Sequence, residues 1–297
     1  MAAAIVLAAA AALLSALAVV LQRVALESAP AGSSLSPRLM THALRQRGWL
    51  TGFALMLAMF VLQAAALRAG QLSVVQPVLT TELIFLVAIL VIGFHRTVGW
   101  RELLGVVAIV AGLAGFFAAA APATGTAEPG GRAWVVVSAV TLAGAVALVA
   151  AARTGPRWWR AAALGAASAV LFADNAALTK TVTALLRHGG WSHVFESWEP
   201  YLVGVTGAAG LFLVQSALHA GPITASRTAS VIVNPLASIA IGAAAFGERL
   251  RPGAAFVTLD VLALAVLCAG VAVLVSSPLV GGPAVAADGE FLGAAGR

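Results

Sequence analysis

Charged residues, cysteine and tyrosine are all scarce in this sequence. Only 9% of its 297 residues are charged and 61% are hydrophobic, whereas soluble domains average about 25% and 45–50%. This composition excludes an ordinary soluble protein, and a mean hydropathy of +1.01 indicates that most of the chain lies in a bilayer. The single cysteine, Cys268, excludes an internal disulfide and a thiolate metal cluster.

Acidic residues are scarcer than basic ones, with 11 Asp and Glu against 17 Lys and Arg. The basic residues are scattered in short loops between apolar segments, as orientation signals are in membrane proteins, so no nucleic acid is expected as a partner. The sequence contains no phosphate-binding glycine loop and no convincing Ser/His/Asp set. We therefore expect neither a cofactor nor an enzymatic activity.

Nine apolar runs are each long enough to cross a bilayer, which takes about 20 helical residues. Their length favours helices over barrel strands of about ten residues, so the expected fold class is an all-α polytopic membrane protein. The runs cover 2–21, 49–67, 72–94, 102–121, 133–152, 161–186, 201–219, 222–246 and 254–276.

Two parts of the chain resemble one another. Segments 49–70 and 201–221 each begin with an aromatic residue, carry a glutamine (Gln63 or Gln215) and end in Ala-Gly, and another apolar run follows at once. The copies lie five helices apart, and because this number is odd the second copy enters the membrane in the opposite direction. Such an inverted-topology repeat is typical of secondary transporters.

The repeat divides the chain into two halves. The expected parts are a first half-repeat at 1–121, a linker at 122–132, a second half-repeat at 133–277 and a flexible cytoplasmic tail at 278–297. Alternate connections hold nine and five arginines, so the positive-inside rule places the N-terminus outside and the C-terminus on the cytoplasmic side of the membrane.

The run after each copy contains a proline, Pro77 or Pro235. Proline loosens a helix and exposes carbonyl groups, and kinks at matching positions in two halves indicate a transporter's binding site. A kink that serves packing alone is the alternative. Gln76 and its repeat counterpart Arg227 lie near the starts of the two proline runs, and Asn234 precedes the second proline, so all three are candidate substrate-binding residues.

Two carboxyl groups, Glu82 and Asp174, lie far from the ends of their apolar runs, and Asn175 follows the second. Their helices are expected to run in opposite directions, so both groups share one depth and can face a common cavity. A carboxyl pair in a low dielectric holds an exchangeable proton, which a proton-coupled carrier needs. Hydrogen-bonded structural residues are the alternative.

Lys180 and Asp260 lie at similar depths near the outer ends of their helices, which predicts an ion pair or an outer gate. The spacing His193-x-x-Glu196-x-x-Glu199 is compatible with a divalent-cation site. Flanking tryptophans favour an interfacial segment there instead, so no metal site is expected.

Several motifs resemble the drug/metabolite transporter superfamily, in its EamA-type branch near the NIPA-like membrane proteins of actinobacteria. They are Gln63-Ala-Ala-Ala-Leu67, Gly70-Gln-Leu-Ser-Val-Val-Gln-Pro77, Leu178-Thr-Lys180, Gln215-Ser-Ala-Leu218, and Asn234-Pro235 with Phe246-Gly-Glu-Arg-Leu250. The resemblance implies an inverted five-plus-five bundle that moves small solutes across a bacterial cytoplasmic membrane. The chain departs from this pattern because the second helix of the first half is missing and the first-copy glutamate is replaced around His95-Arg96.

The sequence thus predicts a secondary transporter that works by alternating access on a small-molecule or ion substrate within the lipid bilayer. A magnesium or other divalent-cation carrier and a non-transporting membrane scaffold are the alternatives, and an intramembrane enzyme ranks below both. A homodimer is an open alternative to the monomer.

Overall fold

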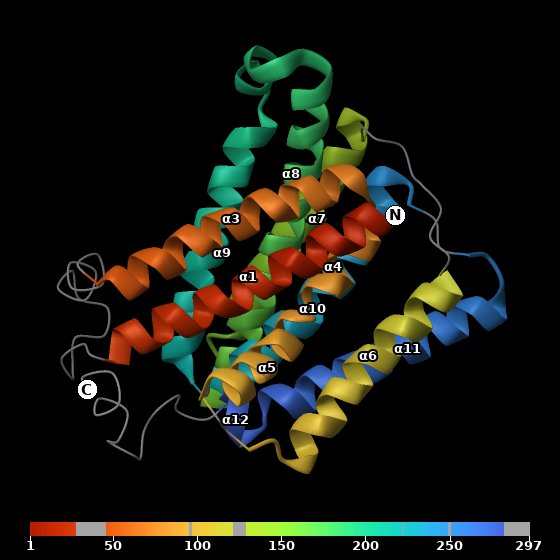
Figure 1. Ribbon diagram of the computed structural model, residues 1–297. Coiled ribbons are helices and arrows are strands. Elements are labelled where there is room, and N and C mark those ends of the chain that lie inside the picture. The colour runs from red at the N-terminus through yellow and green to blue at the C-terminus, as the bar shows by residue number, and fades with distance from the viewer. Residues whose placement is uncertain (28–45, 95–96, 121–128, 222, 249–250, 282–297) are drawn as a thin grey trace.

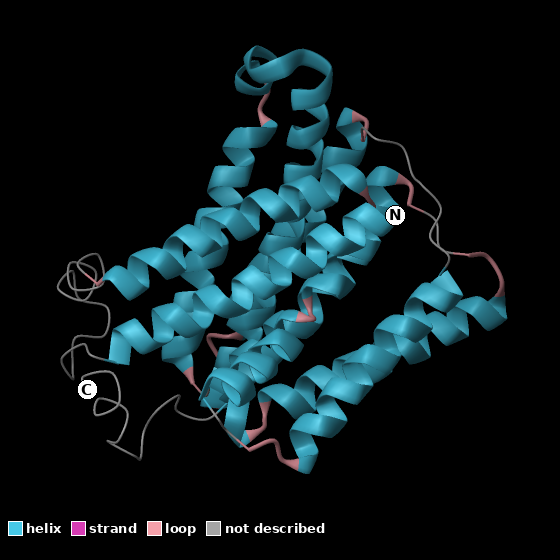
Figure 2. Ribbon diagram, in the orientation of Figure 1, coloured by secondary structure: helices cyan, strands magenta, loops and turns pink. Residues whose placement is uncertain are grey.

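The computed structural model describes residues 1–27, 46–94, 97–120, 129–221, 223–248 and 251–281. In Figure 2 these residues form helices joined by short loops, and no strand occurs among them. Apolar runs form helices because in a bilayer each backbone N–H and C=O group must be bonded within its own segment. The helices are α1 (Ala2–Glu27), α3 (Arg47–Ala69), α4 (Leu72–Leu79), α5 (Glu82–Phe94), α6 (Trp100–Ala120), α7 (Gly131–Ala151), α8 (Arg157–Glu196), α9 (Glu199–Ala220), α10 (Ile223–Phe246), α11 (Ala254–Val275) and α12 (Pro278–Gly281).

Within the described part of the chain, eight segments are long and apolar enough to cross a membrane. They confirm the all-α polytopic fold class and eight of the nine expected spans. The ninth expected span is helical as α9, but the apolar segment found in it, Glu199–Val214, is shorter than the others.

The expected span 72–94 is broken into α4 and α5. The Thr80 hydroxyl donates a hydrogen bond to the Pro77 carbonyl at 2.6 Å, and the Thr81 hydroxyl donates one to the Val78 carbonyl at 2.7 Å. The backbone tightens at the same place, because the Thr80 and Thr81 N–H groups donate to the carbonyls of Pro77 and Val78, three residues back instead of four. The helix therefore stops at Leu79 and restarts at Glu82.

Helix α8 also differs from the expectation, because it runs to Glu196 and not to residue 186. It bends at Gly190, whose φ of 69° lies in the left-handed region that favours glycine. The segment 187–200, between the expected runs 161–186 and 201–219, is therefore mostly helical. In the expected tail, Pro278–Gly281 form the short helix α12, and residues 282–297 lie outside the described residues.

The helices pack in pairs, with α1 against α3, α8 against α9 and α10, and α6 against α11 at one edge of the molecule (Figure 1). The α6–α11 pair is antiparallel, because Arg251 N, just before α11, donates to the carbonyl of Ala120 at the end of α6, at 2.8 Å. Glycine permits the close approach: a Cβ on Gly112 would lie 2.6 Å from the backbone nitrogen of Leu267. The two backbones are thus nearly in contact.

The short helix α4 lies at the centre of the largest apolar cluster. Its residues Leu72 to Val78 are all buried. The cluster joins α4 to α1, α3, α7, α8 and α10 through small side chains such as Ala8 and Ala173 and large ones such as Phe246. Polar groups carried by α4 therefore lie deep inside the bundle.

Candidate functional site

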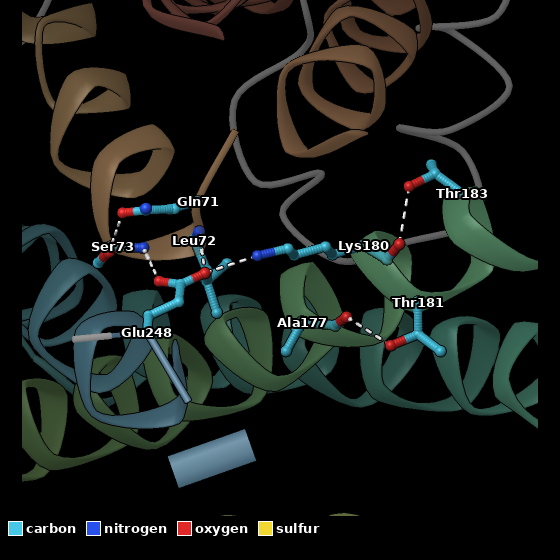
Figure 3. A network of polar contacts seen from close by, with 8 residues as sticks. All are labelled: Gln71, Leu72, Ser73, Ala177, Lys180, Thr181, Thr183 and Glu248. Atoms are coloured by element: carbon cyan, nitrogen blue, oxygen red, sulfur yellow. Dashed lines mark hydrogen bonds and ion pairs between the residues drawn. The ribbon is translucent and has the colours of Figure 1, made fainter. Parts of the chain in front are cut away.

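The Glu248 carboxylate connects three helices at the N-terminal end of α4 (Figure 3). Its Oε1 accepts hydrogen bonds from the backbone N–H of Leu72 at 2.8 Å and from Lys180 Nζ at 2.6 Å, and its Oε2 accepts one from the Ser73 N–H at 2.9 Å. The Glu248 side chain is 1% exposed and that of Lys180 is 14% exposed. We call these two side chains and the two backbone N–H groups the Glu248 network.

The chain folds back after α10 to place this carboxylate. Gly247 has a φ of 62°, and the Glu248 N–H donates to the Gly242 carbonyl at 3.0 Å. A Cβ on Gly242 would lie 2.5 Å from Glu248 Oε2, so a larger residue there would require the carboxylate to move. The carboxylate thereby accepts hydrogen bonds from N–H groups at the start of α4 that have no partner within that helix. Its negative charge also lies at the positive end of the helix dipole, which is favourable.

Lys180 reaches the network from α8. Its Nζ also lies 4.3 Å from the centroid of the Phe246 ring, so the ammonium group has both an anion and an aromatic face as partners. Since Lys180 belongs to α8 and Glu248 follows α10, the network fastens the start of α4 to two helices of the second half.

The pKa of Glu248 is lowered in this environment. Burial on its own would raise the pKa, but the Lys180 charge and hydrogen bonds from Lys180 and Ser73 outweigh burial and hold it below the usual value of 4.5. Because folding lowers this pKa, the contacts of Glu248 stabilise the protein at any pH above the usual carboxyl pKa. The stabilisation is lost only as the pH falls through the lowered pKa. The Glu248 carboxylate therefore stays ionised throughout the neutral range.

The predicted ion pair between Lys180 and Asp260 is wrong, because the partner of Lys180 is Glu248. The sequence placed the two residues at similar depths in the membrane, but they lie on helices that are not neighbours. Helix α11, which carries Asp260, packs mainly on α6 and not on α8. Asp260 is 3% exposed, and neither of its carboxyl oxygens has a hydrogen-bond partner among the described residues.

Sequence reasoning missed Glu248 as a site residue. The available signal was its position: a lone glutamate after a glycine, at the end of an apolar helix that contains a proline. Glycine at that point predicts a helix end where the chain turns back. A carboxylate carried inward by such a turn needs a cation, and Lys180 is the lone lysine of the sequence.

Helices α4 and α10, each with a proline in its interior, meet at two amide side chains. Asn234 Nδ2 donates a hydrogen bond to Gln76 Oε1 at 3.2 Å, next to Pro77 and Pro235. The repeat predicted Gln76 near Arg227, but the side chain that Gln76 contacts is two turns further along α10. Arg227 itself is half-buried near the start of α10.

Asp174 and Asn175 both lie inside the bundle, but they face different neighbours. Asp174 is 3% exposed and accepts a hydrogen bond from Thr141 of α7, and its Oδ1 has no partner within the described ranges. Asn175 Nδ2 donates to the carbonyl of Val203 at 2.6 Å and contacts Thr206 Oγ1 at 3.0 Å, both on α9. These two residues hold α8 against α7 and α9.

Glu82 does not lie in the middle of a continuous helix, because it is the first residue of α5. A carboxylate is favourable at that end of a helix. The principal neighbours of α5 are α1, α6, α11 and α12, whereas those of α8 are α3, α4, α7, α9 and α10. The structure thus does not bring Glu82 and Asp174 into one cavity.

The remaining positions singled out in the sequence are two glutamines and the residues of the possible metal motif. Gln63 is half-buried in α3, and Gln215 belongs to α9 but its side chain lies outside the described residues. His193 and Glu196 end α8 and Glu199 begins α9. Among the described residues no three His, Cys, Asp or Glu side chains gather into a group able to hold a metal ion.

These elements define a multi-pass α-helical membrane protein with charged and polar contacts at the centre of its bundle. An uncharacterized protein of Corynebacterium glutamicum is similar to this chain, with 29% identity over 241 residues that cover 78% of this chain and 80% of the relative. No family profile and no solved structure matches the sequence.

Proposed function

We propose that the chain is a secondary transporter of the drug/metabolite type, which moves a small solute across the bacterial cytoplasmic membrane by alternating access. The observation that carries the proposal is the contact between α4 and α10. Each of these helices contains a proline, they touch through Gln76 and Asn234, and the span that begins with α4 is broken. A broken helix that meets the other half of a membrane protein at polar groups is typical of a transport site.

The packing pattern supports an inverted repeat. Helix α1 packs on α3, α4 and α5 much as α8 packs on α9 and α10, and α6 packs on α11. A two-fold axis in the membrane plane makes α6 and α11 equivalent, and such equivalents must run antiparallel, as they do. In this scheme α7 has no counterpart among the described helices of the first half, so the missing helix corresponds to α7 rather than to the second helix of that half.

The Glu248 network serves as the gate on one side of the membrane in this scheme. It connects α4 to α8 and α10, and these elements must separate for that side to open. A short, buried ion pair that also accepts two backbone hydrogen bonds holds the closed state and releases as one unit.

Distances across this gate test the function without a known substrate. Spin labels at Arg68→Cys and Arg187→Cys, in a Cys268→Ala background in nanodiscs, should give two distance populations in pulsed electron resonance. Glu248→Gln should shift the populations toward the longer distance, because the amide has no charge to bind Lys180. Labels at Leu104→Cys and Leu259→Cys, on the closely packed α6–α11 pair, serve as the control and should give one distance. One gate distance that Glu248→Gln leaves unchanged would favour the membrane scaffold.

Asp174 is the carboxyl group that we propose for proton coupling, since Glu248 stays ionised in the neutral range. Changing the pH between about 5 and 8 should change the ratio of the two gate distances in the parent protein, because the charge state of Asp174 favours one opening. Asp174→Asn keeps the shape and a hydrogen-bonding oxygen for Thr141 but removes the proton site. This variant should fold and lose the pH response, and an unchanged response would make Asp174 a structural residue.

A further inference from the structure

The amide pair at the α4–α10 contact is only half satisfied. Two facing amides can exchange two hydrogen bonds, but Gln76 and Asn234 share one, at 3.2 Å. Gln76 Nε2 and Asn234 Oδ1 are both buried and have no partner among the residues that the structure describes. If the nitrogen and oxygen positions of both amides were exchanged, one donor and one acceptor would still be left without a partner.

A third polar group without a partner lies one turn further along α10. Ser238 is fully buried, and its hydroxyl has no hydrogen-bond partner in the described ranges. It follows Asn234 by four residues and so lies on nearly the same side of the helix. By contrast, Ser230, one turn before Asn234, donates to the Gly165 carbonyl of α8 at 2.9 Å and is satisfied. On α4 and α10, the unpaired groups therefore lie at the level of the two prolines and the turn after them.

The three side chains of α4 and α10 that carry unpaired groups are uncharged. The nearest ion pair, Lys180 with Glu248, lies about one turn away along α4 and is neutralised within its own network. Asp174 of α8 contacts α7 through Thr141 and keeps one unpaired carboxyl oxygen, Oδ1. A charged solute would need an opposite charge in this low dielectric, whereas a neutral solute needs only hydrogen bonds.

We propose that Gln76, Asn234 and Ser238 recognise an uncharged solute through a primary carboxamide or urea group. Such a group offers an N–H donor for Asn234 Oδ1 and a carbonyl acceptor for Gln76 Nε2, with the Ser238 hydroxyl free to bond either atom. This inference rests on the proposed transport function, because α4 and α10 must part to admit the solute. It explains why polar groups that destabilise the empty protein are kept in its core.

The stability of the empty protein gives the first test. The double variant Gln76→Leu with Asn234→Leu should unfold at the same temperature as the parent protein or higher, because it removes two unpaired buried groups together with the one bond between them. A structural amide pair predicts a lower unfolding temperature in the double variant. Thr258→Val is the control for hydroxyl removal on an exposed helix face, where the hydroxyl bonds only to its own helix.

Ligand binding gives the second test, on full-length protein in nanodiscs. Propionamide at roughly 100 mM should raise the unfolding temperature, whereas propionate and propylammonium at the same concentration should not. The rise should vanish in Gln76→Leu and in Asn234→Leu and persist in Thr258→Val. A rise with propionate or propylammonium that Gln76→Leu abolishes would overturn the solute class and leave transport standing. A lower unfolding temperature of the double variant, or no rise with propionamide, would overturn the proposal, and the gate distances would still decide the proposed function separately.

Discussion

Lys180→Met should destabilise the protein strongly. The substitution keeps a long apolar stem but leaves the Glu248 carboxylate, whose side chain is 1% exposed, without its cation. Removing one partner of a buried pair costs about 3–5 kcal/mol, mostly because the other charge is left buried. We expect the apparent Tm in detergent or nanodiscs to fall by about 5–10 °C.

A double-mutant cycle separates the ion pair from a general packing defect. Glu248→Gln should lower the Tm of the parent protein but should change the Tm of Lys180→Met little or even raise it, because the amide removes the stranded charge. The coupling should amount to about 1–3 kcal/mol. Additive effects of the two substitutions would show that the Lys180–Glu248 pair does not form.

The second large effect is expected at the crossing of α6 and α11. A Cβ on Gly112 would lie 2.6 Å from the Leu267 nitrogen and 2.8 Å from the Ala263 carbonyl oxygen, and neither backbone atom can yield without moving the helix. Gly112→Ile should therefore force the two helices apart and destabilise the protein by about 3 kcal/mol. Thermal unfolding of the purified variant measures this loss.

Gly204→Ile is the matched control for this prediction. Gly204 lies on the exposed face of α9, and a Cβ there would meet nothing within 4 Å. The same side chain in the same class of helix should leave the Tm unchanged or raise it slightly, because isoleucine is the better helix former. Equal losses at Gly112 and Gly204 would contradict the close crossing.

The helices were predictable because one physical constraint decides them. A bilayer demands internal hydrogen bonds, so an apolar run such as 133–152 forms a helix with nearly the expected bounds, α7 at Gly131–Ala151. The break after Leu79 was harder to predict, because Pro77 is compatible with either a kink or a stop. The threonine hydroxyls that bond the carbonyls at the end of α4 depend on local geometry that the hydrophobic pattern does not contain.

The site was predictable only in part. The two prolines and their neighbours Gln76 and Asn234 stand out in the sequence, and the structure brings them together. The predicted pairings of charged residues were wrong, because depth in the membrane restricts only one coordinate. A contact also requires that the two helices be neighbours. Lys180 could therefore be placed at the right level and still be given Asp260 in place of Glu248.

Accessibility of Ser238 from both sides of the membrane tests alternating access most directly. Ser238 is fully buried at the α10 level where the proposed site lies. Ser238→Cys in a Cys268→Ala background would be treated with a membrane-impermeant thiol reagent in right-side-out and in inside-out vesicles. A transporter that opens in turn to each side predicts labelling in both preparations, and Glu248→Gln should speed the labelling from the side of the Glu248 network. Labelling from one side alone, or from neither, would contradict alternating access.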